Sequence, residues 1–337
     1  MNFYAYKFPG TSKPVTGMGP TLTGSLAGSG FAIAPFSGDS MATIMIRGER
    51  RFPLRDLNTL ARLGADDTIY KFPSASTTRE SHSKEVESIV SKIKEGKLTK
   101  AIATRCIVDD VDIDICATFL NLCESYPEAF VFCFHTPATG TWIGASPELL
   151  LTSRAGQMKS MALAGTRKAF TGGDWDHKNI EEQRIVADYI CRSMCEYGFS
   201  PRMQPTMTLV AGPVEHLMTL ISASTVGHSA DDILRFAEAI SPTPALCGHP
   251  RDDAYRAIGD AEDFQRAYYG GFCGPVEADG SMSLYVNLRS MWIEKGRYCI
   301  YAGGGITEDS VADDEWTETE NKASTLLSKL RWPTDPN

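Results

Sequence analysis

The sequence predicts an α+β fold in which antiparallel strands form sheets and helices pack outside them. Two observations favour this class. Apolar segments typical of strands follow one another across short turns, as residues 142–153 and 157–166 do across Arg154-Ala155-Gly156, and such hairpins pair antiparallel. Segments with helical periodicity stand between the groups of strands. The chain has 337 residues, of which 42% are hydrophobic, enough for one large domain or two closely joined ones.

The N-terminal part of the chain predicts short strands followed by a helix. Residues 1–60 are interrupted at brief intervals by glycine and proline, which is typical of short strands and turns. After a polar loop, apolar residues recur at spacings of three, four and seven, which is the period of an amphipathic helix, and Gly96 closes it. The apolar face of this helix carries Val86, Ile89, Val90 and Ile93.

The remaining elements are helices and further groups of strands. A strand from Lys100 to Val108 comes first, and residues 129–135 form a second, strongly apolar strand. Helices are expected at residues 114–125, 178–197, 230–240 and 251–267, and again at the C-terminal end. The last three strands are expected at residues 269–277, 282–294 and 297–303.

Charge and cysteine content disfavour several classes of protein. The net charge of −9 argues against a surface for nucleic acid or for an anionic membrane. No apolar run approaches about 20 residues, so no membrane span is expected, and the start of the chain lacks the apolar region of a signal peptide. The nine cysteines form no Cys-x-x-Cys pair and the six histidines do not cluster, which favours reduced thiols and no zinc site. We therefore expect a cytoplasmic protein.

Three glutamates stand on helix faces that should point inward. Glu315, Glu318 and Lys322 lie three and four residues apart, and leucines continue their face along the helix. Glu182 falls on the apolar stripe of the 178–197 helix, where a salt bridge to a basic residue is the alternative interpretation. Buried carboxylates are costly unless they are paired or bind a metal. Together the three glutamates suit Mg²⁺, which prefers oxygen ligands.

Two further residues suggest a base and an acid. Lys100 opens a strand on a face that it shares with apolar or weakly polar neighbours. If that face is buried, desolvation favours the neutral amine, which can act as a base. Glu148 follows Pro147 and enters an apolar strand, where a carboxyl group keeps its proton more readily and can serve as a general acid. A surface lysine and an edge-strand glutamate are the alternatives.

Several residues suit the binding of an anion such as a carboxylate. Backbone N–H groups of Gly165 and Thr166, and those of Gly303–Gly305, can donate to an anion, although ordinary tight turns are the alternative. Arg289 ends a half-apolar strand and can make a bidentate contact, with a salt bridge at the rim as the alternative. Neither glycine-rich segment has the order of a dinucleotide fingerprint or a P-loop.

Taken together and in this order, these segments resemble the chorismate-utilising enzymes, a family that includes isochorismate synthases, salicylate synthases, anthranilate synthase large subunits and aminodeoxychorismate synthases. The similarity extends from about residue 97 to residue 327, whereas residues 1–70 match poorly. The matching segments are residues 100–105, 144–150, 163–166, 178–186, 214–217, 241–250, 262–271 and 301–322.

The resemblance implies the fold of anthranilate synthase component I, a chorismate-binding fold. This fold has two large, mostly antiparallel sheets, helices packed outside, and the site in a cleft between the sheets. Residues 1–75 would be a strand-rich segment that completes the sheets, residues 76–331 the catalytic domain, and residues 332–337 a tail.

The resemblance also implies roles for individual residues. Glu182, Glu315 and Glu318 would bind Mg²⁺, which would bridge to the ring carboxylate of chorismate. Lys100 matches the base that activates water for attack at ring C2, and Glu148 matches the acid that protonates the departing C4 hydroxyl. The residues that would hold the ring and its carboxylates are Gly165, Thr166, His216, Tyr269, Arg289, Gly303, Gly305 and Lys322.

Position 100 separates the branches of the family, because the water-using members resemble this chain in carrying lysine there. Aminodeoxychorismate synthases carry a lysine where this chain has Ala164, and no glutaminase subunit is expected. We therefore expect a monomeric isochorismate synthase that binds chorismate and Mg²⁺ and serves menaquinone or siderophore synthesis. Salicylate synthase, which goes on to eliminate pyruvate, is the alternative. A catalytically inactive relative is a third interpretation, which Lys100 and Glu148 together disfavour.

Three positions depart from the pattern of the family. Ala162 replaces the usual proline, and Asn179 stands where many members have an acidic residue near the metal. Gln183 replaces a frequent histidine directly after the metal-binding glutamate. These departures concern the geometry of the metal site rather than membership of the family.

Overall fold

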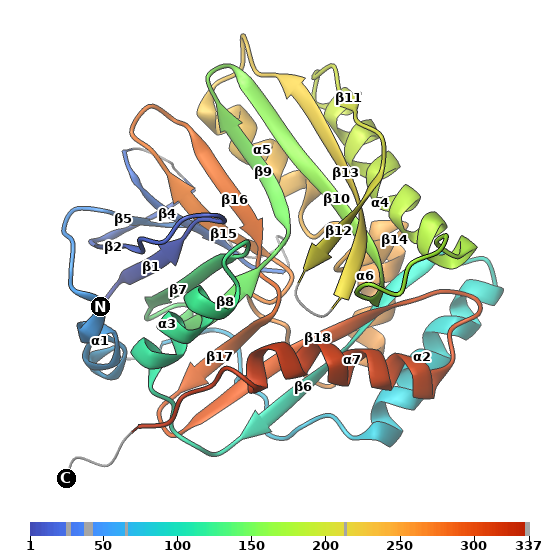
Figure 1. The fold of residues 1–337 in the computed structure, drawn as a ribbon, viewed down its shortest axis with the longest axis horizontal. Helices are drawn as coiled ribbons and strands as arrows, with labels where there is room; N and C mark the ends of the chain where they lie inside the picture. The colour runs from blue at the N-terminus through green and yellow to red at the C-terminus, as the bar shows by residue number, and fades with distance from the viewer. Residues whose placement is uncertain (25–27, 37–42, 65–66, 212–213, 334–337) are drawn as a thin grey trace.

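The chain forms two antiparallel sheets that pack against each other, with helices around them (Figure 1). The computed structural model describes residues 1–333 apart from residues 25–27, 37–42, 65–66 and 212–213. Aromatic side chains of both sheets meet in one core; the rings of Tyr4 and Phe31, from different sheets, stack with centroids 5.1 Å apart. The predicted α+β class with two large antiparallel sheets is therefore confirmed. Of the expected tail, residues 334–337 lie outside the described residues.

The first sheet has eight described strands, and each neighbouring pair is antiparallel. In spatial order they are β14 (Gly248–His249), β6 (Lys100–Asp109), β18 (Arg297–Ile306), β17 (Ser290–Glu294), β8 (Gly140–Ser146), β7 (Phe130–Thr136), β1 (Phe3–Lys7) and β2 (Val15–Met18). Strands β6 and β18 pair along their whole length, so Lys100 lies at the same end of this strand pair as the glycines of β18.

The second sheet is larger and is antiparallel as well. Its spatial order is β11 (Arg202–Met203), β13 (Val214–Ser224), β10 (Gln157–Lys168), β9 (Leu149–Arg154), β16 (Met282–Val286), β15 (Phe272–Val276), β4 (Gly30–Ala34), β5 (Ile44–Arg47) and β3 (Thr21–Thr23), and β12 (Met207–Ala211) also pairs with β13. The expected hairpin across Arg154-Ala155-Gly156 is confirmed as β9 and β10.

The helices pack on the sheets from outside (Figure 1). They are α1 (Leu57–Leu63, after a 3-10 turn at Leu54–Asp56), α2 (Arg79–Lys94), α3 (Ile115–Ser125), α4 (His177–Glu196), α5 (Ala230–Ile240), α6 (Arg251–Ala261) and α7 (Ala312–Leu327). Helix α4 lies on β10 and β13, and α7 lies on β18 beside α2. These two placements bring the acidic faces of α4 and α7 to the glycine-rich end of β18. No helix of the described residues is long and apolar enough to cross a membrane.

Two predicted strands are each broken, and both breaks are places where the chain passes from one sheet to the other. The expected strand 142–153 divides into β8 and β9 at Pro147, which has no N–H for a ladder hydrogen bond. The expected strand 282–294 divides into β16 and β17 before Arg289, whose φ of +47° is incompatible with an extended strand. Pro147 is visible in the sequence as a residue that can interrupt a strand, whereas nothing in the pattern of residues 282–294 marks the break before Arg289.

Other differences from the predicted elements are local. Helix α6 ends at Ala261 rather than at residue 267. The short α1 lies in a region expected to hold only strands, and β13 was not predicted. Strand β13 is covered by α4 on one face and paired on both edges, so its residues do not alternate simply between apolar and polar.

Candidate active site

The two crossovers and the glycine-rich part of β18 surround a cavity of about 90 Å³. The sequence-predicted residues that line it are Glu148, Gly165, Thr166, Glu182, His216, Tyr269, Arg289, Gly303, Gly305 and Lys322. Three predicted residues are outside this lining: Lys100 pairs with Glu182 and Glu318 pairs with Lys322, both of which line the cavity, whereas Glu315 pairs with Lys178, which does not. The cavity is smaller than the roughly 300 Å³ at which ligand pockets begin. A ligand of the size that such pockets usually hold would have to displace some of the lining side chains.

Lys100 is fully buried, at 0% exposure, and points inward from the start of β6. Its Nζ lies 2.8 Å from Glu182 Oε1. A side chain at Gly305 would place its Cβ 2.4 Å from that carboxylate and 3.0 Å from Lys100 Cε, so a larger residue there would have to displace the Glu182 side chain. The surface-lysine alternative is therefore wrong, and the salt-bridge interpretation of Glu182 is correct for this structure.

The other two glutamates of the predicted metal site are also paired with lysines. Glu315 Oε1 accepts a hydrogen bond from Lys178 Nζ at 3.1 Å, and Glu318 Oε1 lies 2.7 Å from Lys322 Nζ. Burial raises the pKa of Glu315. Burial also opposes ionisation of Glu318, but the ammonium of Lys322 outweighs it and the pKa is lowered.

The three carboxylates form three ion pairs along β18 rather than one compact cluster. Among the described residues no group of three Asp, Glu, His or Cys side chains has the geometry to hold a metal ion. The donor set nevertheless suits Mg²⁺, which takes carboxylate oxygens. Glu315 Oε2 is buried without a hydrogen-bond partner, and Gly304 leaves the space in which a Cβ would lie 3.1 Å from it. An oxygen in this state is ready to accept a cation or a donor.

Glu148 occupies the first crossover and is almost completely buried. Its Oε1 has no hydrogen-bond partner. Burial raises the pKa of Glu148 to about 8, although Lys100, Lys322 and Arg289 partly oppose that shift. At neutral pH this carboxyl group therefore keeps its proton, as the sequence analysis expected of a general acid.

His216, on β13, is neutral and has one defined tautomer. Burial and the neighbouring Arg289 guanidinium lower the pKa of His216 to about 3. Its Nδ1 lies 3.0 Å from Gly165 O and 3.1 Å from Thr166 Oγ1. Because a carbonyl oxygen only accepts, Nδ1 carries the hydrogen. Nε2 then accepts from Arg289 Nη2 at 3.2 Å, so the imidazole joins the two sides of the cavity.

Arg289 sits at the second crossover in the left-handed region, which is rare for a residue other than glycine. Its carbonyl accepts from Ala145 N of β8 at 3.1 Å, which fixes the backbone between the sheets. Such strain is concentrated at functional sites. The guanidinium is aimed into the cavity, where His216 is its one recorded hydrogen-bond partner among the described residues. It has donors to spare for an anion.

Tyr269 and Lys322 complete the cavity next to β18. The Tyr269 ring stacks on Tyr301 with centroids 5.4 Å apart, and burial raises the pKa of Tyr269, so its hydroxyl stays protonated. Lys322 Nζ donates to Gly303 O at 2.8 Å as well as pairing with Glu318. The Gly303 carbonyl is therefore already bound within the protein.

Sequence reasoning missed Lys178, the partner of Glu315. Lys178 lies four residues before Glu182 on α4, and that spacing would have suggested a pair within one helix, whereas the structure pairs it with α7. The replacement of a histidine by Gln183 has a local explanation: Gln183 Nε2 donates to Thr219 Oγ1 at 2.7 Å on β13.

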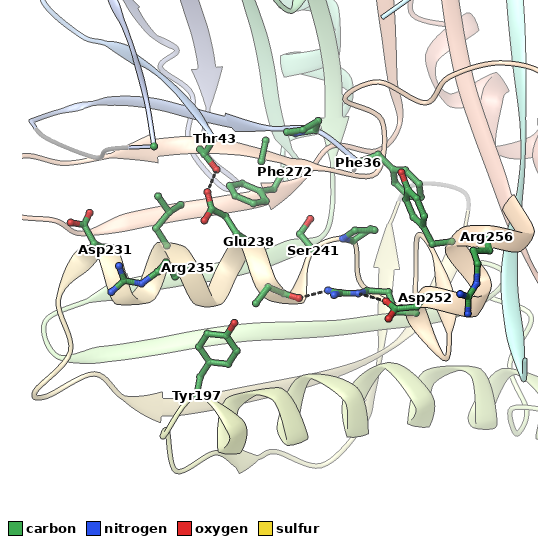
Figure 2. Close-up of a pocket in the computed structure, with 18 residues that line it drawn as sticks. Phe36, Thr43, Tyr197, Asp231, Arg235, Glu238, Ser241, Asp252, Arg256 and Phe272 are labelled. Carbon is green, nitrogen blue, oxygen red and sulfur yellow. Dashed lines mark hydrogen bonds and ion pairs between the residues drawn. The ribbon is translucent and has the colours of Figure 1, made fainter. Parts of the chain in front are cut away.

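A larger cavity of about 870 Å³ lies elsewhere, among β4, α5 and α6 (Figure 2). It contains none of the residues predicted for the site. Two hydrogen bonds occupy polar groups of its lining: Thr43 Oγ1 donates to Glu238 at 2.5 Å, and Arg251 donates to Ala239 O. The smaller cavity, with its buried and partly unpaired ionisable groups, is the better candidate for chemistry.

Comparison with known proteins shows the family of this chain. The family model described as "chorismate binding enzyme" matches residues 54–331. This chain belongs to the chorismate-binding enzyme family. The isochorismate synthase MenF of Pasteurella multocida is 34% identical over 270 residues, which cover 73% of this chain but 60% of that protein.

Solved structures of the family share the fold. The menaquinone-specific isochorismate synthase MenF of Escherichia coli superposes with a TM-score of 0.79 at 21% identity, covering 98% of this chorismate-binding enzyme and 89% of that chain. Anthranilate synthase component I of Streptococcus pneumoniae gives 0.69 at 17% identity, covering 97% and 92% of the two chains. At such identities the likeness concerns the fold alone.

Proposed function

We propose that this chorismate-binding enzyme is an isochorismate synthase, which adds water at ring C2 of chorismate and expels the C4 hydroxyl. The observation that carries the proposal is the presence of Lys100 and Glu148, two buried ionisable groups, in one site. Addition of water needs a base and departure of a hydroxyl needs an acid. The site holds one candidate for each of these two roles.

Glu148 suits the acid role because its proton is present at neutral pH. Its pKa, raised to about 8 by burial, keeps the carboxyl group neutral yet able to release a proton to a developing hydroxide. Its Oε1 is not engaged by the protein. A hydroxyl that leaves beside it would thus meet a free donor in a site shielded from water.

Lys100 suits the base role once its partner is neutralised. Its Nζ lies 2.8 Å from the carboxylate of Glu182, so an ion pair holds the side chain in place. A cation bound by Glu182 would draw this carboxylate away and leave Lys100 Nζ free to contact a water molecule. The chemistry of base and metal ligand would thereby be coupled through one ion pair.

The cation implied by the family is Mg²⁺, held by Glu182, Glu315 and Glu318. It would neutralise the carboxylates and bind the ring carboxylate of the substrate. The three glutamates support this assignment by their donor type, and the unpartnered Oε2 of Glu315 supports it by its burial. Lys178 and Lys322 balance the negative charge of two of these glutamates.

Chorismate carries two carboxylates, and the site has cationic groups to receive them. Arg289 offers a guanidinium at the crossover, and Lys322 offers an ammonium beside β18. Gly165 and Thr166 line the cavity as well, and Thr166 N is bound within the protein by Asn179 Oδ1. We assign Arg289 to the enolpyruvyl carboxylate and the Gly165–Thr166 side to the ring carboxylate.

The direct test is to incubate the protein with chorismate and Mg²⁺ and to separate the products by chromatography. We expect isochorismate in a stable mixture with chorismate, and no reaction in EDTA until Mg²⁺ is restored. Salicylate formed together with stoichiometric pyruvate would instead make the protein a salicylate synthase. Unchanged chorismate under all conditions would refute both functions.

A further inference from the structure

A chain of hydrogen bonds connects the start of α4 to the candidate site through Asn179. Asp176 caps α4, because its Oδ1 accepts from Asn179 N at 2.8 Å. Its Oδ2 accepts from Asn179 Nδ2 at 2.7 Å. At the other end of the same amide, Asn179 Oδ1 accepts from Thr166 N at 2.9 Å. The amide thus links the helix cap to the strand that lines the cavity.

The strand needs this support because it is irregular at that point. The pairing of β10 with β13 shifts register between Ala164 and Thr166, and Gly165 has a φ of +74°. A bulge leaves a backbone group without its ladder partner, and Asn179 supplies the partner for Thr166 N. A Cβ at Gly165 would lie 3.0 Å from Asn179 O and 3.2 Å from Asn179 Cβ, so bulge and helix are in close contact.

The two ends of this arrangement require an amide. A backbone N–H can only donate and an ionised carboxylate can only accept. The side chain between Thr166 N and Asp176 must therefore accept at one end and donate at the other. Asparagine does both, whereas the acidic residue that the family resemblance suggests for position 179 could only accept.

We propose that Asn179 is a positioning residue of the site, which sets the Gly165–Thr166 bulge and through it the binding of the substrate's ring carboxylate. The proposal rests on the proposed function for the identity of the ligand. The position of the bulge also sets the position of His216, because Thr166 Oγ1 and Gly165 O both contact His216 Nδ1.

The neighbouring cations are paired with other carboxylates. Arg167 and Lys178 are the basic groups that act on Asp176. Arg167 Nε is bound to Glu215 at 2.5 Å, and Lys178 is bound to Glu315. If position 179 were acidic, it would face Asp176 with no free cation of these two between them. The two carboxylates would repel each other and move apart, and the hydrogen bond from Thr166 N to residue 179 would be lost.

The test is a reciprocal exchange of the two side chains. Asn179→Asp should raise KM for chorismate about tenfold, the effect of losing about one hydrogen bond. The change in kcat should be smaller, because the contact holds the substrate and the transition state alike. Asp176→Asn should have a milder effect, because asparagine also caps helices well. The double variant Asp176→Asn/Asn179→Asp should regain most of the wild-type KM. Its amide, now at position 176, would donate to the carboxylate at position 179, and that carboxylate would accept from Thr166 N.

Hydrogen exchange of the peptide containing Thr166 gives a readout that does not depend on activity. Protection should be lost in Asn179→Asp and restored in the double variant. A double variant as impaired as Asn179→Asp, or a lower kcat at unchanged KM with a lower Tm, would overturn the positioning role. Wild-type protein that forms no isochorismate would refute the proposed function instead, while the exchange data would still test the hydrogen-bond chain.

Discussion

Lys100 Nζ lies 2.8 Å from Glu182 Oε1, so the residue predicted to be the base and a residue predicted to bind the metal form one buried ion pair. The pair explains how a lysine can be fully buried in β6 without an isolated charge. Gly305 leaves room for the pair, since a Cβ there would lie 2.4 Å from Glu182 Oε1 and force that carboxylate to move. The base and the metal site should therefore respond together when either one is changed.

Replacement of Lys100 should abolish most of the activity. Lys100→Ala should lower kcat by about 10²–10⁴-fold, the usual contribution of a positioned acid or base. Lys100→Arg should fail as well, because arginine does not give up its proton. Steady-state kinetics with chorismate measure the effect. Lys97→Ala, an exposed lysine paired with Glu95, is the matched control and should be close to wild type; near-normal kcat in Lys100→Ala would remove Lys100 from the mechanism.

The raised pKa of Glu148 predicts opposite effects of Glu148→Gln on activity and stability. The pKa of Glu148 is about 8 in the folded protein, against 4.5 in the unfolded chain. As the pH rises through this range, the unfolded chain releases the proton before the folded protein does. Stability is therefore lost as the pH rises from about 4.5 to about 8. Glutamine cannot ionise, so the variant should unfold a few degrees higher, about 3–5 °C, at pH 8 and at nearly the same temperature at pH 4.5.

The activity of Glu148→Gln should fall by about 10²–10⁴-fold at every pH. In the wild type, kcat should fall as the pH rises above about 8, because the acid must carry its proton. Thermal unfolding and pH–rate profiles measure the two effects. Equal Tm differences at both pH values would show that the buried carboxyl group does not titrate in this range.

Mg²⁺ should stabilise the folded protein through the three glutamates. A ligand that binds only the folded state raises its stability according to its concentration and Kd, so millimolar Mg²⁺ should raise the Tm. Glu318→Gln should weaken this shift and also weaken substrate binding. Glu320→Gln, on an exposed position of the same helix, is the matched control. A shift that is identical in Glu318→Gln and wild type would place the metal elsewhere.

Arg289→Lys should isolate the role of the guanidinium. Arginine and lysine bear the same cost of the left-handed backbone at position 289. The difference in activity between them therefore reports on the paired N–H donors of the guanidinium. Loss of the bidentate contact to a carboxylate should reduce kcat/KM by about 10–100-fold. The guanidinium also donates to His216 Nε2. A change of less than about threefold in kcat/KM would assign Arg289 to the backbone crossover alone.

The sequence predicted those parts of the fold that are encoded by local periodicity. Helices such as α2, α3 and α5 and the β9–β10 hairpin were placed to within a few residues. The crossovers at Pro147 and Arg289 were not predicted, since which sheet a strand joins depends on partners distant in the chain.

The candidate site was predictable to a similar degree. The structure brings Glu148, Arg289 and the Gly165–Thr166 turn to one cavity, and the resemblance to the chorismate-utilising enzymes implied that they share a site. The pairing of Lys178 with Glu315 was not foreseen, because an ion pair between two helices has no signal in sequence spacing. Lys178 pairs with Glu315 of α7 although Glu182 is its neighbour on α4.

The most direct test of the central claim is the fate of solvent oxygen. The protein is incubated with chorismate and Mg²⁺ in water enriched in oxygen-18, and the isochorismate is analysed by mass spectrometry. Attack of water activated by Lys100 and loss of the C4 hydroxyl protonated by Glu148 predict one labelled oxygen per molecule, in the C2 hydroxyl group. Unlabelled isochorismate would contradict this mechanism, and the absence of isochorismate would contradict the proposed function.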